Sequence, residues 1–210
     1  MHNENEWKLT KEEEKRKEVF DKLSEEMRNK GYKQNDLTAG LVEANLLAIL
    51  TTLPFILIFG ILFFVVNRGV AIELSLGVEL IAFASFIVLV VVHELIHGFT
   101  WGLFAKNHFK AISFGVVWKS LNPYCTCSDP LTRTQYIIGS FMPTLILGFG
   151  LAIIATILGN FAMWCVSTFM ILGGGGDFLI ILKILKYKTQ SKDVMYLDHP
   201  YKIGLVVFEK

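Results

Sequence analysis

The stretch Leu80–Ala105 reads LIAFASFIVLVVVHELIHGFTWGLFA, and the interpretation of the whole chain follows from it. It is longer than the ~20 apolar residues that an α-helix needs to cross a bilayer. Its single formally charged residue is Glu94, which lies between His93 and His97. An ionisable side chain in hydrocarbon costs about 3 kcal/mol or more and usually marks a functional site. The stretch therefore predicts a membrane-spanning helix with a polar centre.

Three other apolar runs have comparable length. The four runs, which we expect to be spans, are residues 44–66, 80–105, 134–158 and 160–182. Of the 210 residues, 53% are hydrophobic and 19% are charged, against roughly 25% charged in an ordinary soluble domain. The sequence predicts a mainly α-helical membrane protein with four transmembrane helices and a small cytoplasmic β-hairpin.

The polar segments divide the chain into three regions. We expect a cytoplasmic region with a polar helix in residues 1–43, a four-helix membrane core in 44–186 and a cytoplasmic tail in 187–210, with a strand at Ile203–Phe208. The polar helix, over residues 6–30, has a thin apolar stripe. The helix either lies on the inner membrane surface or docks on a partner, or it is a solvated helix with a narrow contact face, which we favour because the stripe is too narrow for strong membrane binding. The stripe consists of Val19, Phe20, Leu23 and Met27.

The loop 106–133 is expected to hold the hairpin. Its segment Ala111–Trp118 is rich in β-branched and aromatic residues, and the pair Asn122-Pro123 precedes a short return segment, Tyr124–Ser128. The strand at 111–118 has two possible roles. It either pairs with an unwound substrate by β-augmentation, or the hairpin only closes the cytoplasmic side of the core.

Basic residues cluster on one side of the predicted core. They precede the first span, lie in loop 106–133 and follow the fourth span, whereas Arg68 is the only basic residue between the first two spans. By the positive-inside rule, both termini and this loop face the cytoplasm, and we expect the chain in the plasma membrane. The net charge of +1 gives no indication of a nucleic-acid partner. The expected surroundings are the lipid bilayer.

The spacing of the two histidines is typical of a zinc site. Residues four apart lie on one face of a helix, so the imidazoles of His93 and His97 can bind one Zn²⁺. Glu94 then projects beside the metal, where its carboxylate can accept a proton from water. We therefore expect His93 and His97 as metal ligands and Glu94 as a catalytic base.

A catalytic zinc site needs a third protein ligand. Position 103 is leucine, which excludes a histidine six residues after His97, and the only later glutamate is Glu209, at the end of the chain. Of the remaining acids and histidines, Asp177 alone lies within a predicted span. Its depth of roughly 8–9 Å from the cytoplasmic end agrees with the roughly 12 Å of His97. We predict Asp177 as the third ligand, with His108 as the alternative. The others are Asp129, Asp193, Asp198 and His199.

Several polar residues and small residues near these spans are further candidates. Ser140, Asn122 and His108 are possible oxyanion-stabilising or substrate-binding residues. The run Gly173–Gly176 allows a close backbone approach to the motif helix or a local break that directs Asp177 toward the metal, and both are compatible with ordinary packing of small residues between helices. The pair Cys125 and Cys127 is expected to be reduced in the cytoplasm. It could bind metal or respond to oxidants, although alternation along a strand explains it equally well.

These residues together resemble the site-2 protease class of intramembrane metalloproteases, and more closely the small bacterial zincin peptidases of that type. The resemblance covers roughly residues 90–205, and only the metal motif in it is specific. It is carried by His93-Glu94-Leu95-Ile96-His97-Gly98, Asp177, Asp198-His199-Pro200 with Gly204, the loop Pro123–Leu131 and Pro143.

The resemblance implies Zn²⁺ bound by His93, His97 and Asp177, with Glu94 as base and a site that opens to the cytoplasm. One departure stands out, because glycine precedes Asp177 and Phe178 follows it, whereas the larger class commonly has an Asp-Gly pair after an Asn- and Pro-containing pattern. Because of this departure, the resemblance does not identify an oxyanion-stabilising asparagine in this chain.

The expected function is hydrolysis of peptide bonds in single-span proteins or membrane-held peptides. Two other classes use the same buried residues: a transporter or metal-binding membrane protein, and a non-catalytic interaction protein. A transporter would not need Glu94 as a base, so Glu94→Gln separates it from a protease. The sequence indicates no oligomeric state.

Overall fold

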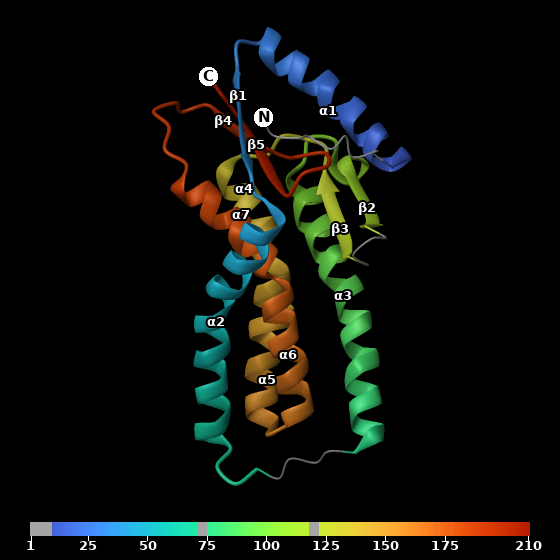
Figure 1. Ribbon diagram of the computed structural model, residues 1–210, viewed down its shortest axis with the longest axis vertical. Helices are drawn as coiled ribbons and strands as arrows, with labels where there is room; N and C mark the ends of the chain where they lie inside the picture. The colour runs from blue at the N-terminus through green and yellow to red at the C-terminus, as the bar shows by residue number, and fades with distance from the viewer. Residues whose placement is uncertain (1–9, 71–74, 118–121) are drawn as a thin grey trace.

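The computed structural model describes residues 10–70, 75–117 and 122–210. A helical bundle is capped at one end by β-structure and an N-terminal helix (Figure 1). The first elements are α1 (Lys11–Asn29), β1 (Lys33–Thr38) and α2 (Leu41–Val66). The next are α3 (Leu76–Phe104), the 3₁₀-helix η1 (His108–Ala111), β2 (Ile112–Val117) and β3 (Asn122–Cys127). The last are α4 (Arg133–Pro143), the π-helix η2 (Thr144–Gly150), α5 (Leu151–Leu158), α6 (Phe161–Gly173), α7 (Gly175–Lys186), β4 (Val194–Asp198) and β5 (Gly204–Glu209).

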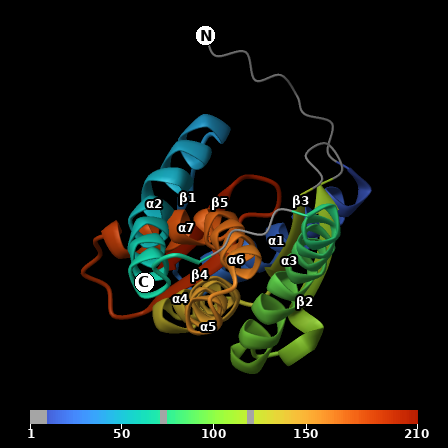
Figure 2. The ribbon, with the colours of Figure 1, turned by 90° about the horizontal axis from the view of Figure 1, so that it is seen from below.

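In the part of the chain that the structure describes, three helical segments are long and apolar enough to cross a membrane. They are Leu41–Val66, Leu76–Phe104 and the stretch Arg133–Leu158, which comprises α4, η2 and α5. A fourth results if α6 and α7, which are bent by 41° at their junction, count as one span. Viewed along the helices, α6 lies between α2 and α3 and contacts both (Figure 2). These segments correspond to the four apolar runs of the sequence.

The glycine run breaks the fourth apolar segment. Gly174 separates α6 from α7, and a Cβ on it would lie 2.0 Å from Thr144 Oγ1. Gly175 is equally close to α2, since a Cβ there would lie 2.6 Å from the Cβ of Ala48. Larger side chains at these two positions would push α7 away from its neighbours. The expected break therefore occurs and places Asp177 in the first turn of α7. The close approaches of the glycine run are to Thr144 and to α2, and not to the motif helix α3 as one interpretation of the sequence had it.

A three-stranded antiparallel sheet lies at the polar end of the bundle. Its order is β1-β5-β4, so the expected tail strand, β5, is the central one. Four consecutive residues of β5 are buried because both faces of the sheet are covered; they are Leu205, Val206, Val207 and Phe208. The sequence prediction did not include β1 and β4, which are short and carry charged residues. Their strand conformation depends on pairing with β5.

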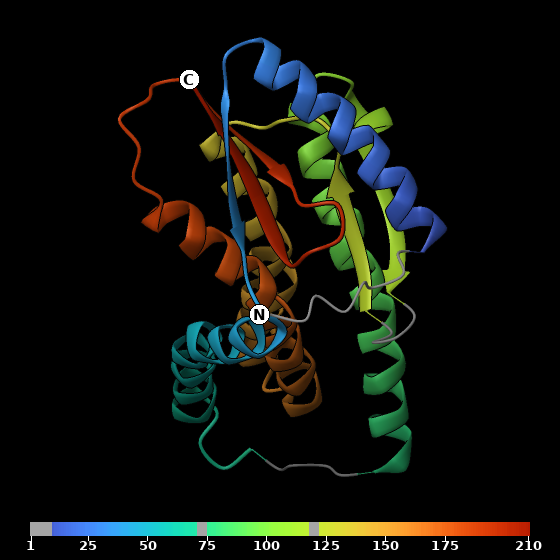
Figure 3. The same ribbon diagram turned by 45° about the horizontal axis from the view of Figure 1, so that its top comes forward.

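Helix α1 packs across one face of this sheet (Figure 3). Met27 is buried, and Phe20 and Leu23 pack beside it against the sheet. Val19 is 47% exposed, so the contact face is narrower than the apolar stripe of the sequence. The helix ends before Gly31, whose φ of +88° is in the left-handed region. The described part of the expected helix confirms a contact face, while residues 6–9 lie outside the described residues.

The β2–β3 hairpin packs directly on the face of α3 that follows the histidines. A Cβ on Gly98 would lie 2.4 Å from the ring of Phe114 in β2, and one on Gly102 would lie 2.5 Å from the ring of Phe109 in η1, which precedes the hairpin. The two glycines are four residues apart and so form a flat surface on one face of the helix. Of the expected strand 111–118, residues Ile112–Val117 form β2, Ala111 is the last residue of η1, and Trp118 lies outside the described residues. The hairpin is thus held beside the His93–His97 segment.

Because the side chain of Met27 is buried, we expect the packing of α1 on the sheet to depend measurably on it. Met27→Ala should weaken the packing of α1 on the sheet by about 2–5 kcal/mol, because a buried methionine leaves a cavity. The detached population, and with it tryptic cleavage within α1, should rise at least about tenfold. The matched control is Val19→Ala on the exposed side of the same stripe. Equal cleavage rates for the two variants would contradict the docking shown here.

Candidate metal centre

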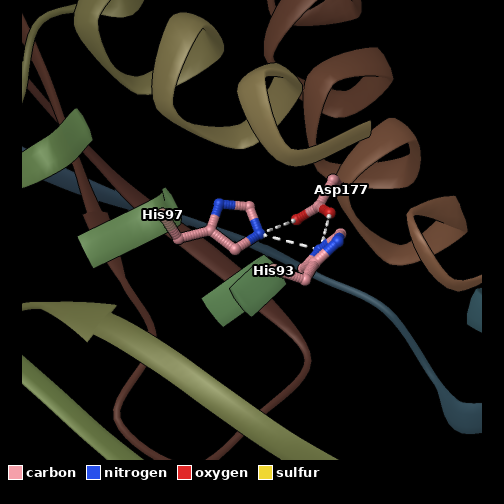
Figure 4. A group of neighbouring side chains, drawn as sticks. All are labelled: His93, His97 and Asp177. Atoms are coloured by element: carbon pink, nitrogen blue, oxygen red, sulfur yellow. Dashed lines mark hydrogen bonds and ion pairs between the residues drawn. The ribbon is translucent and has the colours of Figure 1, made fainter. Parts of the chain in front are cut away.

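Two helices bring three metal-ligating side chains together (Figure 4). Among the residues that the structure describes, His93, His97 and Asp177 form the one group whose ligand atoms lie within 4.8 Å of one another. Each imidazole Nε2 lies 3.2 Å from a different oxygen of Asp177, and the two Nε2 atoms are also 3.2 Å apart. A tetrahedral zinc ion with bonds of about 2.0–2.2 Å places its ligand atoms about 3.3–3.6 Å apart. The group therefore has nearly the spacing that zinc requires.

The carboxylate of Asp177 is in an environment that favours its charged form. Its side chain is 17% exposed, and those of His93 and His97 are 10% and 5% exposed. Asp177 lies in the first turn of α7, where the helix dipole stabilises negative charge. A nearly buried carboxylate still requires a cationic partner. Such a partner can be a proton shared with a histidine or a metal ion held by all three side chains.

The hydrogen bond made by one ring nitrogen of His97 shows that the other nitrogen is available as a metal ligand. His97 Nδ1 lies 2.9 Å from the backbone oxygen of Gly139. A carbonyl oxygen only accepts hydrogen bonds, so Nδ1 must carry the proton, and in the neutral ring Nε2 then has a free electron pair. This pair points at an Asp177 oxygen, and the two acceptors would repel unless a cation lies between them. The donor set therefore fits a metal ion.

Two aromatic residues complete the surroundings of His97. The indole of Trp101 stacks on the imidazole, with ring centroids 4.9 Å apart and an angle of 16° between the planes. The Nε1 of Trp101 donates to the backbone oxygen of Tyr136 at 3.4 Å. Gly139 makes this arrangement possible, because a Cβ there would lie 2.0 Å from Trp101 Nε1. Metal-bound histidines commonly have such outer partners, which fix the ring orientation.

Glu94 is half-buried beside this group and does not belong to it. It follows His93 on α3, and its carboxylate approaches the backbone N–H of Cys125 in β3. The hairpin therefore covers the side of the site on which Glu94 lies. A carboxylate next to a metal, but not bound to it, is placed to accept a proton from water.

A family model described as "Putative zincin peptidase" matches residues 86–192, about half of the chain. The matched part includes α3, α4 and α7 and thus all three clustered side chains. The chain belongs to this family. No curated protein and no solved structure matches the chain. Because a zincin is a zinc metallopeptidase, membership supports metallopeptidase chemistry and supports zinc for the site formed by His93, His97 and Asp177.

The other acids and histidines considered as zincin ligands have different partners. Asp129 accepts hydrogen bonds from the backbone and side-chain amides of Asn107. Asp193 accepts one from Tyr32 Oη, and Asp198 from Tyr136 Oη and Cys127 N. His199 Nδ1 accepts from the backbone amides of Tyr201 and Lys202. His108 is exposed in η1, with a φ of 50°. None of these residues is in the described metal group.

The candidate oxyanion residues are not brought together. Ser140 is buried in α4 next to Gly139, and its hydroxyl has no hydrogen-bond partner among the described residues. His108 is exposed, and the side chain of Asn122 lies outside the described part of the chain. Sequence reasoning missed Gly139 and Trp101. The role of Gly139 depends on its backbone oxygen, and every residue type has one, so the sequence gives no signal for it. Trp101 is one of many apolar residues in α3 and is not distinguished from them by its type.

The geometry predicts the metal content of the protein. Detergent-purified wild type and Glu94→Gln should each bind close to one zinc ion per chain, because Glu94 is not a ligand. Asp177→Ala should lose most of the metal, since two histidines alone bind it weakly. His108→Ala, which changes an exposed histidine outside the group, is the matched control. Zinc retained in Asp177→Ala but lost in His108→Ala would reverse the assignment.

The thiols of Cys125 and Cys127 are buried and unreactive in character. Burial raises the pKa of Cys127 to about 12 and also raises the pKa of Cys125, with nearby carboxylates such as Asp198 adding to both shifts. Because the thiolate is the reactive form, iodoacetamide at pH 8 should modify both thiols at least about 100-fold more slowly in the folded protein than in denaturant. Mass spectrometry of the two thiols gives the rates. Fast modification of folded protein would show that β3 leaves α3 readily.

Proposed function

We propose that this zincin peptidase is an intramembrane zinc endopeptidase of the site-2 protease type. It would hydrolyse peptide bonds in or near the membrane spans of its substrates. The observation that carries this proposal is the meeting of His93, His97 and Asp177 inside two apolar helical segments, with Glu94 beside them. A soluble zincin has no need to place its metal ligands on helices of this length and hydropathy.

The outer surface of the bundle supports a location in the bilayer. Large aliphatic side chains on the outward faces of α2 and α3 are more than half exposed, among them Ile58, Ile61, Leu80, Ile81 and Val88. An apolar surface of this extent is unfavourable in water and typical of contact with lipid. We propose that α2, α3, the α4–α5 segment and the α6–α7 pair are the four spans of a plasma-membrane protein.

We further propose that the polar end of the bundle faces the cytoplasm. This end holds α1, the three-stranded sheet and the end of the tail (Figure 1). A chain with an even number of spans has both termini on one side of the membrane, which agrees with this arrangement. The basic residues of the tail and of loop 106–133 favour the cytoplasmic side. The site would then open toward the cytoplasm, which supplies the water for hydrolysis.

The chain's own residues fill most of the roles that peptide hydrolysis requires. Zinc, when bound, would act as a Lewis acid on the scissile carbonyl and on the attacking water. Glu94 would accept a proton from that water and return it to the leaving amine. His97 would stay in its Nδ1-protonated form through its hydrogen bond with Gly139 O. Ser140, next to Gly139, is our candidate for stabilising the developing oxyanion, because its buried hydroxyl has no other described partner.

A membrane-spanning protein or peptide is the proposed substrate. Its helix must unwind before attack, since intrahelical hydrogen bonds protect its peptide bonds. The hairpin offers an extended template for the unwound segment. β3 lies against α3, and Cys125 N–H is close to the Glu94 carboxylate, so a strand bound along the hairpin would pass beside the base.

The base role of Glu94 predicts a specific loss of activity. Glu94→Gln should lower the turnover of a single-span test protein in proteoliposomes by about 10²–10⁴-fold, the usual contribution of a general base. Its zinc content and melting temperature should match those of wild type. Cleavage is followed by gel shift and mass spectrometry of the products.

The conservative variant Glu94→Asp provides the control for charge. It keeps the carboxylate but withdraws it by one methylene, so its activity should lie between those of wild type and Glu94→Gln. If Glu94→Gln cleaves the test protein as fast as wild type, the protease mechanism proposed here is wrong. A transport or binding role would then account better for the same metal group.

A further inference from the structure

The backbone oxygen that orients His97 lies at a place where helix α4 lacks a donor. In an α-helix, the carbonyl of residue 139 accepts a hydrogen bond from the N–H of residue 143. Residue 143 is Pro143, inside α4, and proline has no N–H. The Gly139 carbonyl is therefore free to accept from His97 Nδ1, at 2.9 Å. We infer that Pro143 is a positioning residue, which holds His97 in its metal-binding tautomer by leaving this acceptor open.

The next amide along the chain does not take the place of the missing donor. The N–H of Thr144 donates to the carbonyl of Phe141. From Thr144 to Gly150 the helix continues with π-helical geometry, in which each hydrogen bond spans one residue more than in an α-helix. Such a change of register is typical of a functional site on a helix. The helical hydrogen bonding is thus displaced at the level of His97.

The free carbonyl and two neighbouring groups together fix the imidazole. The Gly139 oxygen binds one ring nitrogen, Trp101 stacks on one ring face, and Asp177 lies at the other nitrogen. Without the first contact, the proton could move to Nε2, which would then be unable to bind a metal. With an N–H at position 143, the Gly139 carbonyl would have an intrahelical donor that competes with His97. Pro143 thus acts on the metal site without touching it.

The effect on metal binding follows from the loss of an outer partner. Removing the hydrogen bond to a ligating histidine typically weakens metal affinity by about 10–100-fold. Pro143→Ala restores the N–H while leaving the three ligand side chains intact, so we expect a weakening in this range. The inference rests on the proposed role of His97 as a ligand, but its tautomer can be measured without metal.

The first measurement is the ring ¹⁵N spectrum of histidine-labelled, metal-free protein in detergent. His97→Gln identifies the His97 signals by their disappearance. At a pH high enough for the imidazole of His97 to be neutral, wild type should show a protonated Nδ1 and an unprotonated Nε2, and Pro143→Ala should show a mixture of both neutral tautomers. If metal-free wild type has its proton on Nε2, the inference is overturned whether or not any variant folds.

The second measurement is zinc affinity, by competition with a chromophoric chelator. Pro143→Ala should bind zinc about 10–100-fold more weakly than wild type. The matched control is Pro54→Ala, which makes the same change at an exposed position inside α2. It should alter neither the affinity nor the His97 signals.

The outcomes separate the inference from the proposed function. An unchanged affinity and an unchanged tautomer in folded Pro143→Ala would overturn the role of Pro143 while leaving the zinc site in place. No zinc binding by wild type would instead defeat the proposed function, and the ¹⁵N spectrum would still decide whether Pro143 controls the tautomer.

Discussion

The pairing of one acid with two imidazoles is the constraint on which the arrangement of the helices depends. A carboxylate on an apolar helix is unfavourable unless a cation or several donors accompany it. Asp177 satisfies this requirement with His93 and His97 of α3. α7 must therefore meet α3 at one level, although α6 lies in contact with α3 along the rest of the bundle. The 41° bend at Gly174 makes both contacts possible.

Helix α4 braces the two helices that supply the ligands. It contacts both α3 and α7. At its beginning, the guanidinium of Arg133 donates to the carbonyls of Ile184 and Leu185 and so satisfies acceptors at the end of α7. In its middle, the Gly139 carbonyl accepts from His97. The distance between the histidines and Asp177 is thus set by contacts with a third helix as well as by the ligands themselves.

The sequence was sufficient for the parts of the site that depend on residue type and spacing. The spacing of His93 and His97 and the isolation of Asp177 in an apolar run indicated the three side chains that the structure brings together. The apolar runs indicated the long helices, because hydropathy over about 20 residues is a strong signal. The hairpin was indicated by its composition, but the turn expected at Asn122-Pro123 was wrong in place, because both residues belong to β3 and pair with Val117 and Val116 of β2.

The parts that the sequence did not indicate depend on tertiary contacts. β1 (KQNDLT) is a polar strand whose conformation comes from pairing with β5, so its own composition gives little signal. β4 (VMYLD) is mostly apolar but only five residues long, and it too pairs with β5. The bend at Gly174 was one of two alternatives, since a glycine run permits both a break and close packing. The role of Gly139 requires knowing which carbonyl faces His97. Only the absence of an N–H four residues later, at Pro143, hints at it.

The carboxylate of Asp198, which lies on the sheet outside the helical bundle, connects the hairpin beside Glu94 with the helix that supports His97. Asp198 of β4 accepts hydrogen bonds from the Tyr136 hydroxyl on α4 and from Cys127 N–H on β3. Burial raises the pKa of Asp198, and these two donors oppose that shift. Tyr136 accepts from Trp101, which stacks on His97, while β3 runs beside Glu94. Both connections meet at one carboxylate, so hydrogen bonds tie the tail sheet to the hairpin beside Glu94 and to the helix that supports His97. Glu94, His93 and His97 are already fixed relative to one another by α3, so this link positions the hairpin and α4 around them.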